Sequence, residues 1–191
     1  MTDDEQRPGT IRKLLKSETP LIGEHLMRLD SDARARRFGH HVSDQFIAAY
    51  SVQAANIGAV TFAYLIGGQA HAIAEMKRSR VLGPSAAEAA FSVERDYANQ
   101  GIATDLMGRV IRSARNRGVT HLVLTCLAEN AKMRAIAAKY GAELHIEDGS
   151  VVGDIVPKGA DYYSIASELF DDRLACVFAA LDFQMRLQRA A

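Results

Sequence analysis

The residues whose types and spacing most clearly suggest chemistry form a short turn, Gln100-Gly101-Ile102-Ala103-Thr104. It follows an apolar, strand-like run, Ala89–Val93, and opens an amphipathic segment, Ala103–Asn116, with helical spacing. The first N–H groups of a helix have no acceptor within it, and the helix dipole places partial positive charge there. Gly101 lacks a Cβ, so its backbone can approach a ligand closely. The turn is therefore predicted to hold a phosphate or pyrophosphate group.

Two carboxylates, Glu75 and Glu88, lie in the apolar segments that lead to this turn. Glu88 is the only carboxylate in the run Ala87–Phe91, and Glu is seldom buried without a reason. Either side chain could act as a general base, and two carboxylates in one pocket would raise each other's pKa. The alternative for Glu88 is a strand-end charge in solvent. The alternative for Glu75 is an ion pair with the basic residues that follow it at 77–80.

The pattern before the turn predicts a strand, three short helices and three further strands. Thr19 and Pro20 are typical of a helix start, and Gly67-Gly68 between two apolar runs is typical of a hairpin. The predicted elements are a strand at Thr10–Leu15, helices starting at Pro20, Ser31 (to Arg37) and Ser43, and strands at Ala59–Ile66, Ala70–Met76 and Ala87–Val93.

After the turn we expect a helix, a strand, a second helix, a hairpin and a C-terminal helix. Gly118 ends the first helix, and Asn130 and Gly141 bound the second. The strands are predicted at His121–Cys126, buried on both faces, and at Ala142–Ile146 and Val151–Val156. The C-terminal helix, from Ser164, carries an apolar stripe that we expect to pack on its own domain: Leu174, Val177, Phe178, Leu181 and Met185.

Composition narrows the class of protein. The 191 residues carry 23 Lys and Arg against 23 Asp and Glu, so net charge gives no reason to expect a nucleic-acid or anionic-membrane partner. The two cysteines, Cys126 and Cys176, are too few for a disulfide framework and match no metal motif. No apolar run is long enough to span a bilayer, and residues 1–9 lack the core of a signal peptide. We therefore expect a cytoplasmic protein with a flexible N-terminus at residues 1–9.

On these residues the chain resembles the GNAT N-acetyltransferases over roughly residues 10–147. The family's cofactor motif, Arg/Gln-x-x-Gly-x-Gly/Ala, matches Ala98–Ala103, except that Ala98 replaces the Arg or Gln. The family also has an Asn at the start of the next helix and a Gly eleven residues later, as at Asn130 and Gly141. The segment Glu24–Asp30 looks like the substrate-side helices of bacterial members, some of which acetylate protein lysines.

The resemblance implies an α/β (α+β) fold with a central mixed, mostly antiparallel twisted sheet flanked by helices. The acetyltransferase domain would span residues 10–160, and a helical extension at 161–191 would pack on that domain or on a partner subunit. It implies acetyl-CoA as co-substrate and no metal. The residues expected to bind acetyl-CoA are Phe91, Ser92, Val93, Ala98, Asn99, Gln100, Gly101, Ile102, Ala103, Thr104 and Asn130.

The resemblance also assigns catalytic roles. Similar bacterial enzymes use a Glu at the position of Glu88 as the general base, and Glu75 is the competing base. Many members protonate the leaving thiolate with a Tyr at the position that is Ala137 here, so Tyr140, three residues on, is the nearest substitute. Water could replace it, or no acid is needed. A bulge splays the strand, Ser92 or Val93 donates its N–H to the thioester carbonyl, and the slot beside the 124–126 segment holds the pantetheine.

Three hypotheses follow. The first is an acetyl-CoA:amine N-acetyltransferase, with a small-molecule amine or a protein lysine as acceptor, acting as a monomer or homodimer. The second is a non-catalytic acyl-CoA-binding or regulatory module on the same fold, suggested by Ala98 and Ala137. The third, an unrelated α/β nucleotide binder, would need a Rossmann Gly-x-Gly-x-x-Gly or a Walker lysine, and the sequence has neither.

Overall fold

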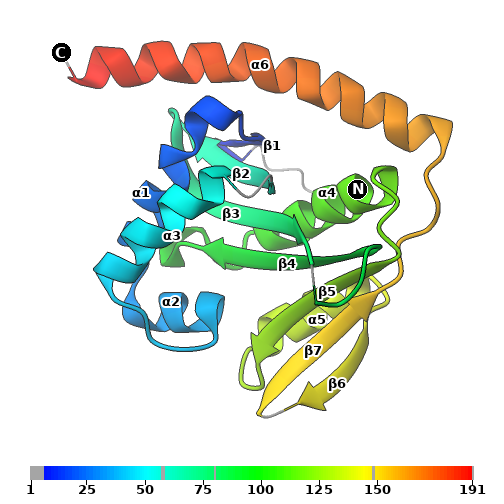
Figure 1. The fold of residues 1–191 in the computed structure, drawn as a ribbon. Coiled ribbons are helices and arrows are strands. Elements are labelled where there is room, and N and C mark those ends of the chain that lie inside the picture. Colours follow the sequence, from blue (N-terminus) through cyan, green and yellow to red (C-terminus); the bar gives the residue numbers. More distant parts are fainter. Residues whose placement is uncertain (1–6, 57–58, 80, 148, 191) are drawn as a thin grey trace.

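The computed structural model describes residues 7–56, 59–79, 81–147 and 149–190. One seven-stranded sheet organises the chain, in the order β1-β2-β3-β4-β5-β7-β6 (Figure 1). All neighbouring strands are antiparallel except β4 and β5, which are parallel. The strands are β1 Thr10–Lys13, β2 Val60–Ile66, β3 Gln69–Arg78, β4 Ala86–Val93, β5 His121–Leu127, β6 Glu143–Glu147 and β7 Ser150–Ile155.

Helices cover both faces of this sheet (Figure 1). The first three pack on one face, α4 and α5 pack on the other, and α6 crosses the β1 end (Figure 1). The helices are α1 Pro20–Arg28, α2 Ser31–Phe38, α3 Asp44–Asn56, α4 Ile102–Asn116, α5 Ala131–Lys139 and α6 Tyr162–Ala190, with 3-10 turns η1 at Lys16–Glu18 and η2 at Arg95–Tyr97. The mixed, mostly antiparallel sheet that the family resemblance implies is confirmed.

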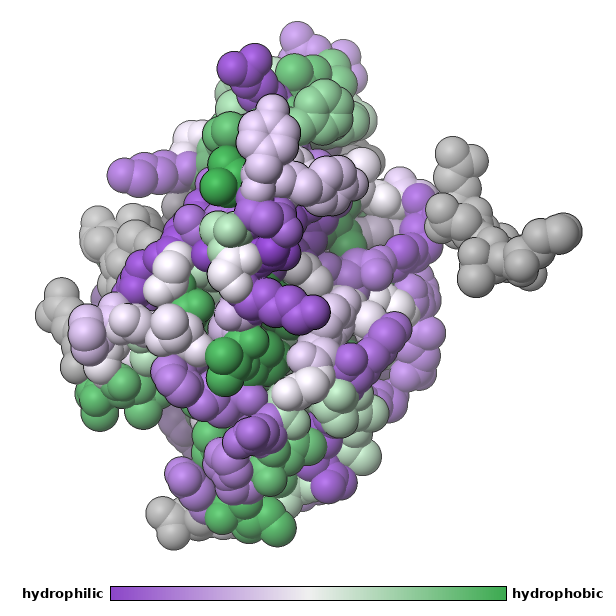
Figure 2. Space-filling view, turned by 90° about the vertical axis from the view of Figure 1, so that its right-hand side faces the viewer, coloured by the Kyte–Doolittle hydropathy of each residue, from purple (hydrophilic) through white to green (hydrophobic). Residues whose placement is uncertain are grey.

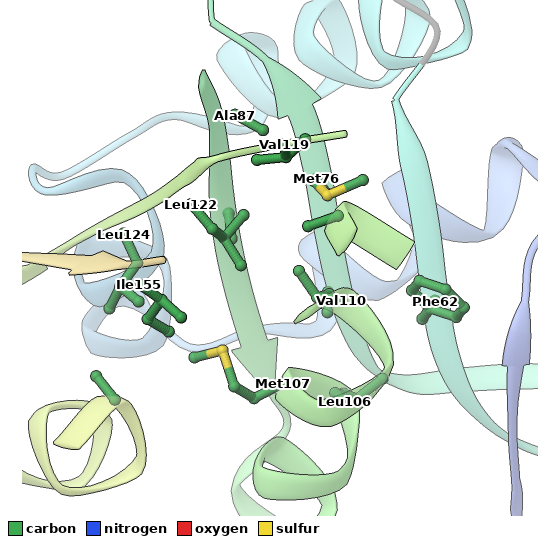
Figure 3. Packing of buried hydrophobic residues seen from close by; sticks show 14 of the residues in the cluster. Phe62, Met76, Ala87, Leu106, Met107, Val110, Val119, Leu122, Leu124 and Ile155 are labelled. Atoms are coloured by element: carbon green, nitrogen blue, oxygen red, sulfur yellow. The ribbon is translucent and has the colours of Figure 1, made fainter. Parts of the chain in front are cut away.

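The larger hydrophobic core lies between the sheet and α4. Leu106, Met107 and Val110 recur at helical spacing and point toward the strands that carry Met76 and Leu122 (Figure 3). All three α4 side chains are fully buried. At about 25 cal/mol per Å² of apolar surface, each such side chain contributes roughly 1.5–3 kcal/mol to folding. This packing fixes α4, and with it the turn that opens α4, against β3 and β4.

A second core lies on the opposite face, under α1 and α3. Ile22 and Leu26 of α1 and Ile47 of α3 pack there on Ile73 of β3. The predicted hairpin at Gly67-Gly68 joins β2 to β3, and both glycines have positive φ. The second core anchors α1, whose polar side chains reach β4.

Two local expectations differ from the structure. Asp30, one residue before the predicted Ser31, caps α2, because its side chain accepts from the N–H of Ala33 at 2.7 Å. β5 is not buried on both faces: Leu122, Leu124 and Cys126 are buried, whereas His121 and Thr125 are exposed. One face of β5 packs on the larger core, while α2 covers only a little of the other face.

The C-terminal helix is held by polar contacts rather than by its predicted apolar stripe. Glu168 is buried and accepts from Ser113, Asn116 and Arg117 of the α4 region, and Asp182 accepts from Arg12 of β1 at 2.7 Å. The five residues of the stripe remain 37–58% exposed. Around the start of α6, hydrophobic residues form small groups separated by hydrophilic ones (Figure 2). Intramolecular burial of the stripe was therefore the wrong expectation, because charged partners on α4 and β1 select a different face of the helix.

Candidate active site

A cleft opens where β4 and β5 separate. Their parallel pairing runs from Ala86 with His121 to Ala89 with Leu124 and then ends, although β4 continues beside β3 and β5 continues beside β7. The register of β3 with β4 is uninterrupted from 87 to 93, so the bulge expected there is not found and the separation has another origin. The cavity between the strands has a volume of about 550 Å³. Its lining follows β4 from Ala89 to Val93 and reaches the first turn of α4.

The glycine turn forms one wall of the cleft. Gly101 has φ 76°, and Asn99 has φ 64°, a left-handed conformation that Asn tolerates better than most residues. A Cβ on Gly101 would meet only a guanidinium nitrogen of Arg7, at 3.9 Å, so the position needs glycine for its backbone conformation rather than for space. Asp105 donates to the Gly101 carbonyl at 3.1 Å. The N–H groups of residues 102–104 have no acceptor in the described part of the chain.

The structure brings the predicted acetyl-CoA-binding residues together. The cleft is lined by every one of them except Gln100: Phe91, Ser92, Val93, Ala98, Asn99, Gly101, Ile102, Ala103, Thr104 and Asn130. Gln100 is exposed, and its side chain donates to the Asp96 carbonyl at 2.9 Å. Asn130 also caps α5, because its side chain accepts from the N–H of Met133 at 3.2 Å.

The backbone direction of β4 decides which of its N–H groups face the cleft. Glu94 donates its N–H to the carbonyl of His71 in β3 at 3.0 Å. Hydrogen-bonding groups alternate along an antiparallel strand, so Ser92 also directs its N–H toward β3. The N–H groups of Phe91 and Val93 point the other way, toward the position that β5 has left. Of the two predicted donors to a thioester carbonyl, Val93 is the one whose N–H faces the cleft.

The two candidate bases differ in their surroundings. Glu88 is exposed next to Ala89, which lines the cleft, and accepts from the Ser79 hydroxyl at 2.8 Å. It makes no ion pair with any described residue. Glu88 itself does not line the cleft. Glu88 is therefore the more accessible carboxylate, although a proton from the cleft would reach it through water.

Glu75 is only 5% exposed, and its carboxylate is already engaged in an ion pair and a hydrogen bond. It pairs with Arg37 of α2, not with the basic residues at 77–80, and it accepts from the Tyr50 hydroxyl at 3.0 Å. Burial and the Glu75 carboxylate raise the pKa of Tyr50 to about 12, so Tyr50 remains a donor at neutral pH. Arg37 lines the cleft. The Arg37–Glu75 ion pair therefore supports the wall of the cleft, and Glu75 is not free to act as a base.

Tyr140 lies away from the cleft. Its hydroxyl donates to the Thr104 carbonyl at 2.9 Å, and it lines a different cavity of about 610 Å³ between α4, β1 and α6. A Cβ on Gly108 would come within 3.0 Å of this hydroxyl, so the glycine leaves room for the phenol. Ala137, the family's acid position, is fully buried. The structure therefore brings no tyrosine acid to the cleft from α5.

Two groups of site residues escaped the sequence reading. Arg36 and Arg37 of α2 line the cleft and were not among the predicted site residues. His25 of α1 is fully buried and contacts Ser92 and Glu94. Its position between Ile22 and Leu26 on the inward face of α1 was the available signal. Cys126 also lines the cleft, and burial raises the pKa of its thiol, which disfavours a nucleophilic role.

The described residues contain no group of three or more His, Cys, Asp or Glu side chains that could hold a metal ion. None of the helices in residues 7–56, 59–79, 81–147 and 149–190 combines the length and the apolar character needed to cross a membrane.

Known structures share this fold. The GNAT domain of PAT from S. lividans is 21% identical to this chain and superposes with a TM-score of 0.65. The match covers 78% of this chain and 90% of the S. lividans domain. The yncA protein from Salmonella typhimurium, solved with its cofactor acetyl-CoA, is 16% identical; the match covers 81% of this chain and 97% of yncA, with a TM-score of 0.60. The ribosomal-protein-S18-alanine N-acetyltransferase from Escherichia coli is 20% identical (81% and 97% covered, TM-score 0.57).

The family model described as acetyltransferase (GNAT) family matches residues 24–142, which include α2, the glycine turn and Asn130. With the separated β4 and β5 strands, the open turn before α4 and this match over more than half of its length, the chain belongs to the GNAT acetyltransferase family.

Proposed function

We propose that the protein transfers an acetyl group from acetyl-CoA to a primary amine by direct attack of the amine on the thioester. The observation that best supports this proposal is that one cleft exposes both the free N–H groups at the start of α4 and the unpaired N–H groups of β4. The pyrophosphate binds at Gly101–Thr104, where the N–H groups have no other acceptor. The pantetheine arm lies between β4 and β5, in place of the missing strand pairing.

Cations around the cleft favour a phosphorylated ligand. Arg36 and Lys132 line it and make no ion pair with any other described residue. Arg95 and Arg37 also line it, but they pair with Asp30 and Glu75. Because Ala98 offers no charged side chain, the turn itself binds through backbone N–H groups. The surrounding cations add attraction for the phosphates that does not depend on the motif's first position.

The reaction needs a neutral amine and a polarised carbonyl. An alkylamine has a pKa near ~10.4 and is mostly protonated at pH 7, so a base must take a proton. Glu88 does this through water, since its carboxylate is exposed and bonded only to Ser79. The Val93 N–H polarises the carbonyl, and a preorganised donor of this kind lowers the barrier by ~3 kcal/mol. The thiolate leaves without a tyrosine acid and is protonated by water.

The acceptor is a small-molecule amine or a protein lysine, and the enzyme acts in the cytoplasm as a monomer or homodimer. The test is thiol release from acetyl-CoA against a panel of small amines and lysine-containing peptides. Glu88→Gln should lower turnover by ~100- to 10,000-fold while CoA affinity is retained. Glu143→Gln is the control, because Glu143 is an exposed carboxylate of β6 outside the cleft.

Three outcomes separate the possibilities. Full activity of Glu88→Gln would remove Glu88 from the mechanism, and a loss confined to Glu75→Gln would move the base to that residue. Thermal stabilisation by CoA without thioester consumption in the presence of any amine would favour the non-catalytic acyl-CoA-binding module instead.

A further inference from the structure

A buried chain of hydrogen bonds ends at the cleft and is not used by the proposed amine transfer. The hydroxyl of Ser92 is 2.9 Å from Nε2 of His25, and Nδ1 of His25 is 3.2 Å from the carboxylate of Glu94. Ser92 lines the cleft, His25 is fully buried, and the Glu94 side chain is 15% exposed. A hydroxyl, an imidazole and an orienting carboxylate in this sequence are the parts of an activated serine nucleophile.

The surroundings determine which atoms of the Ser92–His25–Glu94 hydrogen-bond network carry protons. Burial opposes the charge on Glu94, but hydrogen bonds from His25 and His71 and the charge of Arg28 lower its pKa to about 2. An ionised carboxylate only accepts, so Nδ1 of His25 must carry a proton and donate it to Glu94. Burial lowers the pKa of His25, which keeps the ring neutral. Nε2 therefore has a free lone pair, and the Ser92 hydroxyl donates to it.

The orienting carboxylate is itself held in place. Arg28 donates to the same oxygen of Glu94 at 2.9 Å, and His71 donates to the other oxygen at 2.8 Å. The His71 ring packs against Tyr97 with ring centroids 4.3 Å apart and the two planes tilted by 34°. Two elements, α1 and β3, thus immobilise Glu94, and a fixed carboxylate in turn fixes the His25 ring against Ser92.

The cleft also supplies a donor for a developing oxyanion beside Ser92. The N–H of Val93, the residue directly after Ser92, faces the space between β4 and β5. A backbone N–H that follows the nucleophile serves the same purpose in α/β hydrolases. A thioester carbonyl bound by Val93 therefore lies next to the Ser92 side chain. Nucleophile and oxyanion donor at the end of β4, the base on α1 and the orienting carboxylate of Glu94 just after β4 therefore meet at one end of the cleft.

We propose that Ser92 accepts the acetyl group of acetyl-CoA when no amine is bound, which gives the protein a thioesterase activity. The Ser92 oxygen attacks the carbonyl carbon and its proton passes to Nε2 of His25. The C–S bond breaks, and the CoA thiolate leaves with that proton. Water then adds to the acetyl ester and gives one proton to His25, which passes it to the Ser92 oxygen as the ester bond breaks. Acetic acid departs and loses its remaining proton to solvent. The inference rests on the proposed binding of acetyl-CoA in the cleft.

The experiment follows CoA release from acetyl-CoA in the absence of amine, with peptide mass spectrometry after acid quenching. We expect an acetyl ester on Ser92 that hydroxylamine removes. Ser92→Ala should abolish both the ester and the enzyme-dependent release. His25→Gln should slow release at saturating acetyl-CoA by ~100-fold or more, the scale of a general base, with CoA affinity unchanged. Ser113→Ala, which removes a buried hydroxyl of α4 outside the cleft, is the matched control and should keep the wild-type rate.

The outcomes distinguish this inference from the proposed function. Amine acetylation at a normal rate, with no Ser92 ester and no effect of Ser92→Ala on amine-free release, would overturn the inference and leave the amine transfer standing. A His25→Gln variant that changes only thermal stability would overturn the role of His25 as base. Failure of CoA to bind to the wild-type protein would overturn both proposals.

Discussion

Replacement of Glu94 by Gln should measure how much the charge of Glu94, in the hydrogen-bond network beside Ser92, contributes to the free energy of unfolding. The pKa of Glu94 falls from its usual 4.5 to about 2, because hydrogen bonds from His25 and His71 and the charge of Arg28 outweigh the cost of burial. At about 1.4 kcal/mol per pKa unit, this fall corresponds to about 3 kcal/mol of folding free energy. The Glu94 side chain is 15% exposed, so screening by solvent reduces the figure only a little.

The sign follows from the direction of the shift. A carboxylate with a lowered pKa in the folded protein stabilises it fully above the unfolded pKa, and this contribution is lost as the pH falls toward the folded value. Glu94→Gln should therefore be about 3 kcal/mol less stable than the wild type at pH 7. About 2 kcal/mol of that difference should be gone at pH 3.

The measurement is urea unfolding of both proteins between pH 3 and pH 7, followed by circular dichroism. Glu143→Gln is the matched control, because Glu143 is exposed and has no ion pair with a described residue. We expect the control to follow the wild-type curve at every pH. A difference between Glu94→Gln and wild type that is the same at pH 3 and pH 7 would refute the reasoning, since it would show that the charge of Glu94 contributes nothing.

Two further predictions concern the turn and the C-terminal helix. Gly101→Ala should weaken CoA binding measured by calorimetry, because φ is 76° and a left-handed Ala costs roughly 1–2 kcal/mol. Gly149→Ala is the control: φ is 78° and there is room for a Cβ, so it should cost similar stability and leave CoA affinity intact. Equal CoA affinity in the wild type and both variants would contradict the assignment of the turn as the CoA site. Arg12→Met should cost ~3–5 kcal/mol in urea unfolding, because buried Asp182 loses its cation and buried Glu18 keeps only Arg186, at 4.0 Å. Lys13→Met should cost under ~1 kcal/mol, since its pair with Asp172 is partly exposed, and similar losses in both variants would speak against the buried cluster.

Local signals predicted the turn and its surroundings well. The apolar run before Gly101 and the helical spacing after it depend on neighbouring residues, and both appear as β4 and α4. The cap at Asn130 and the hairpin at Gly67-Gly68 are equally local and are found as predicted. The cleft formed because these elements, once made, can pack in few ways around a parallel β4–β5 pair.

Contacts between distant parts of the chain were not predictable in this way. Glu75 finds Arg37, which lies 38 positions earlier, and His25 contacts Ser92 across 67 positions. Tyr140 turns to the carbonyl of Thr104 because a half-buried phenol needs an acceptor, and helical spacing alone gave no indication of that partner. Periodicity shows which face of an element is apolar, but the partner of a buried polar group depends on how the elements are assembled.

Hydrogen exchange with and without acetyl-CoA tests the central claim most directly, because it reports where on the chain the ligand binds. Acetyl-CoA in the β4–β5 cleft should slow exchange of the N–H groups of residues 101–104, and of Phe91 and Val93, none of which has an acceptor in the described part of the chain. Exchange near the second cavity, at Tyr64 and Arg109, should not change. Unchanged exchange at 101–104 and Val93, or protection confined to the second cavity, would contradict the assignment of this cleft as the acetyl-CoA site.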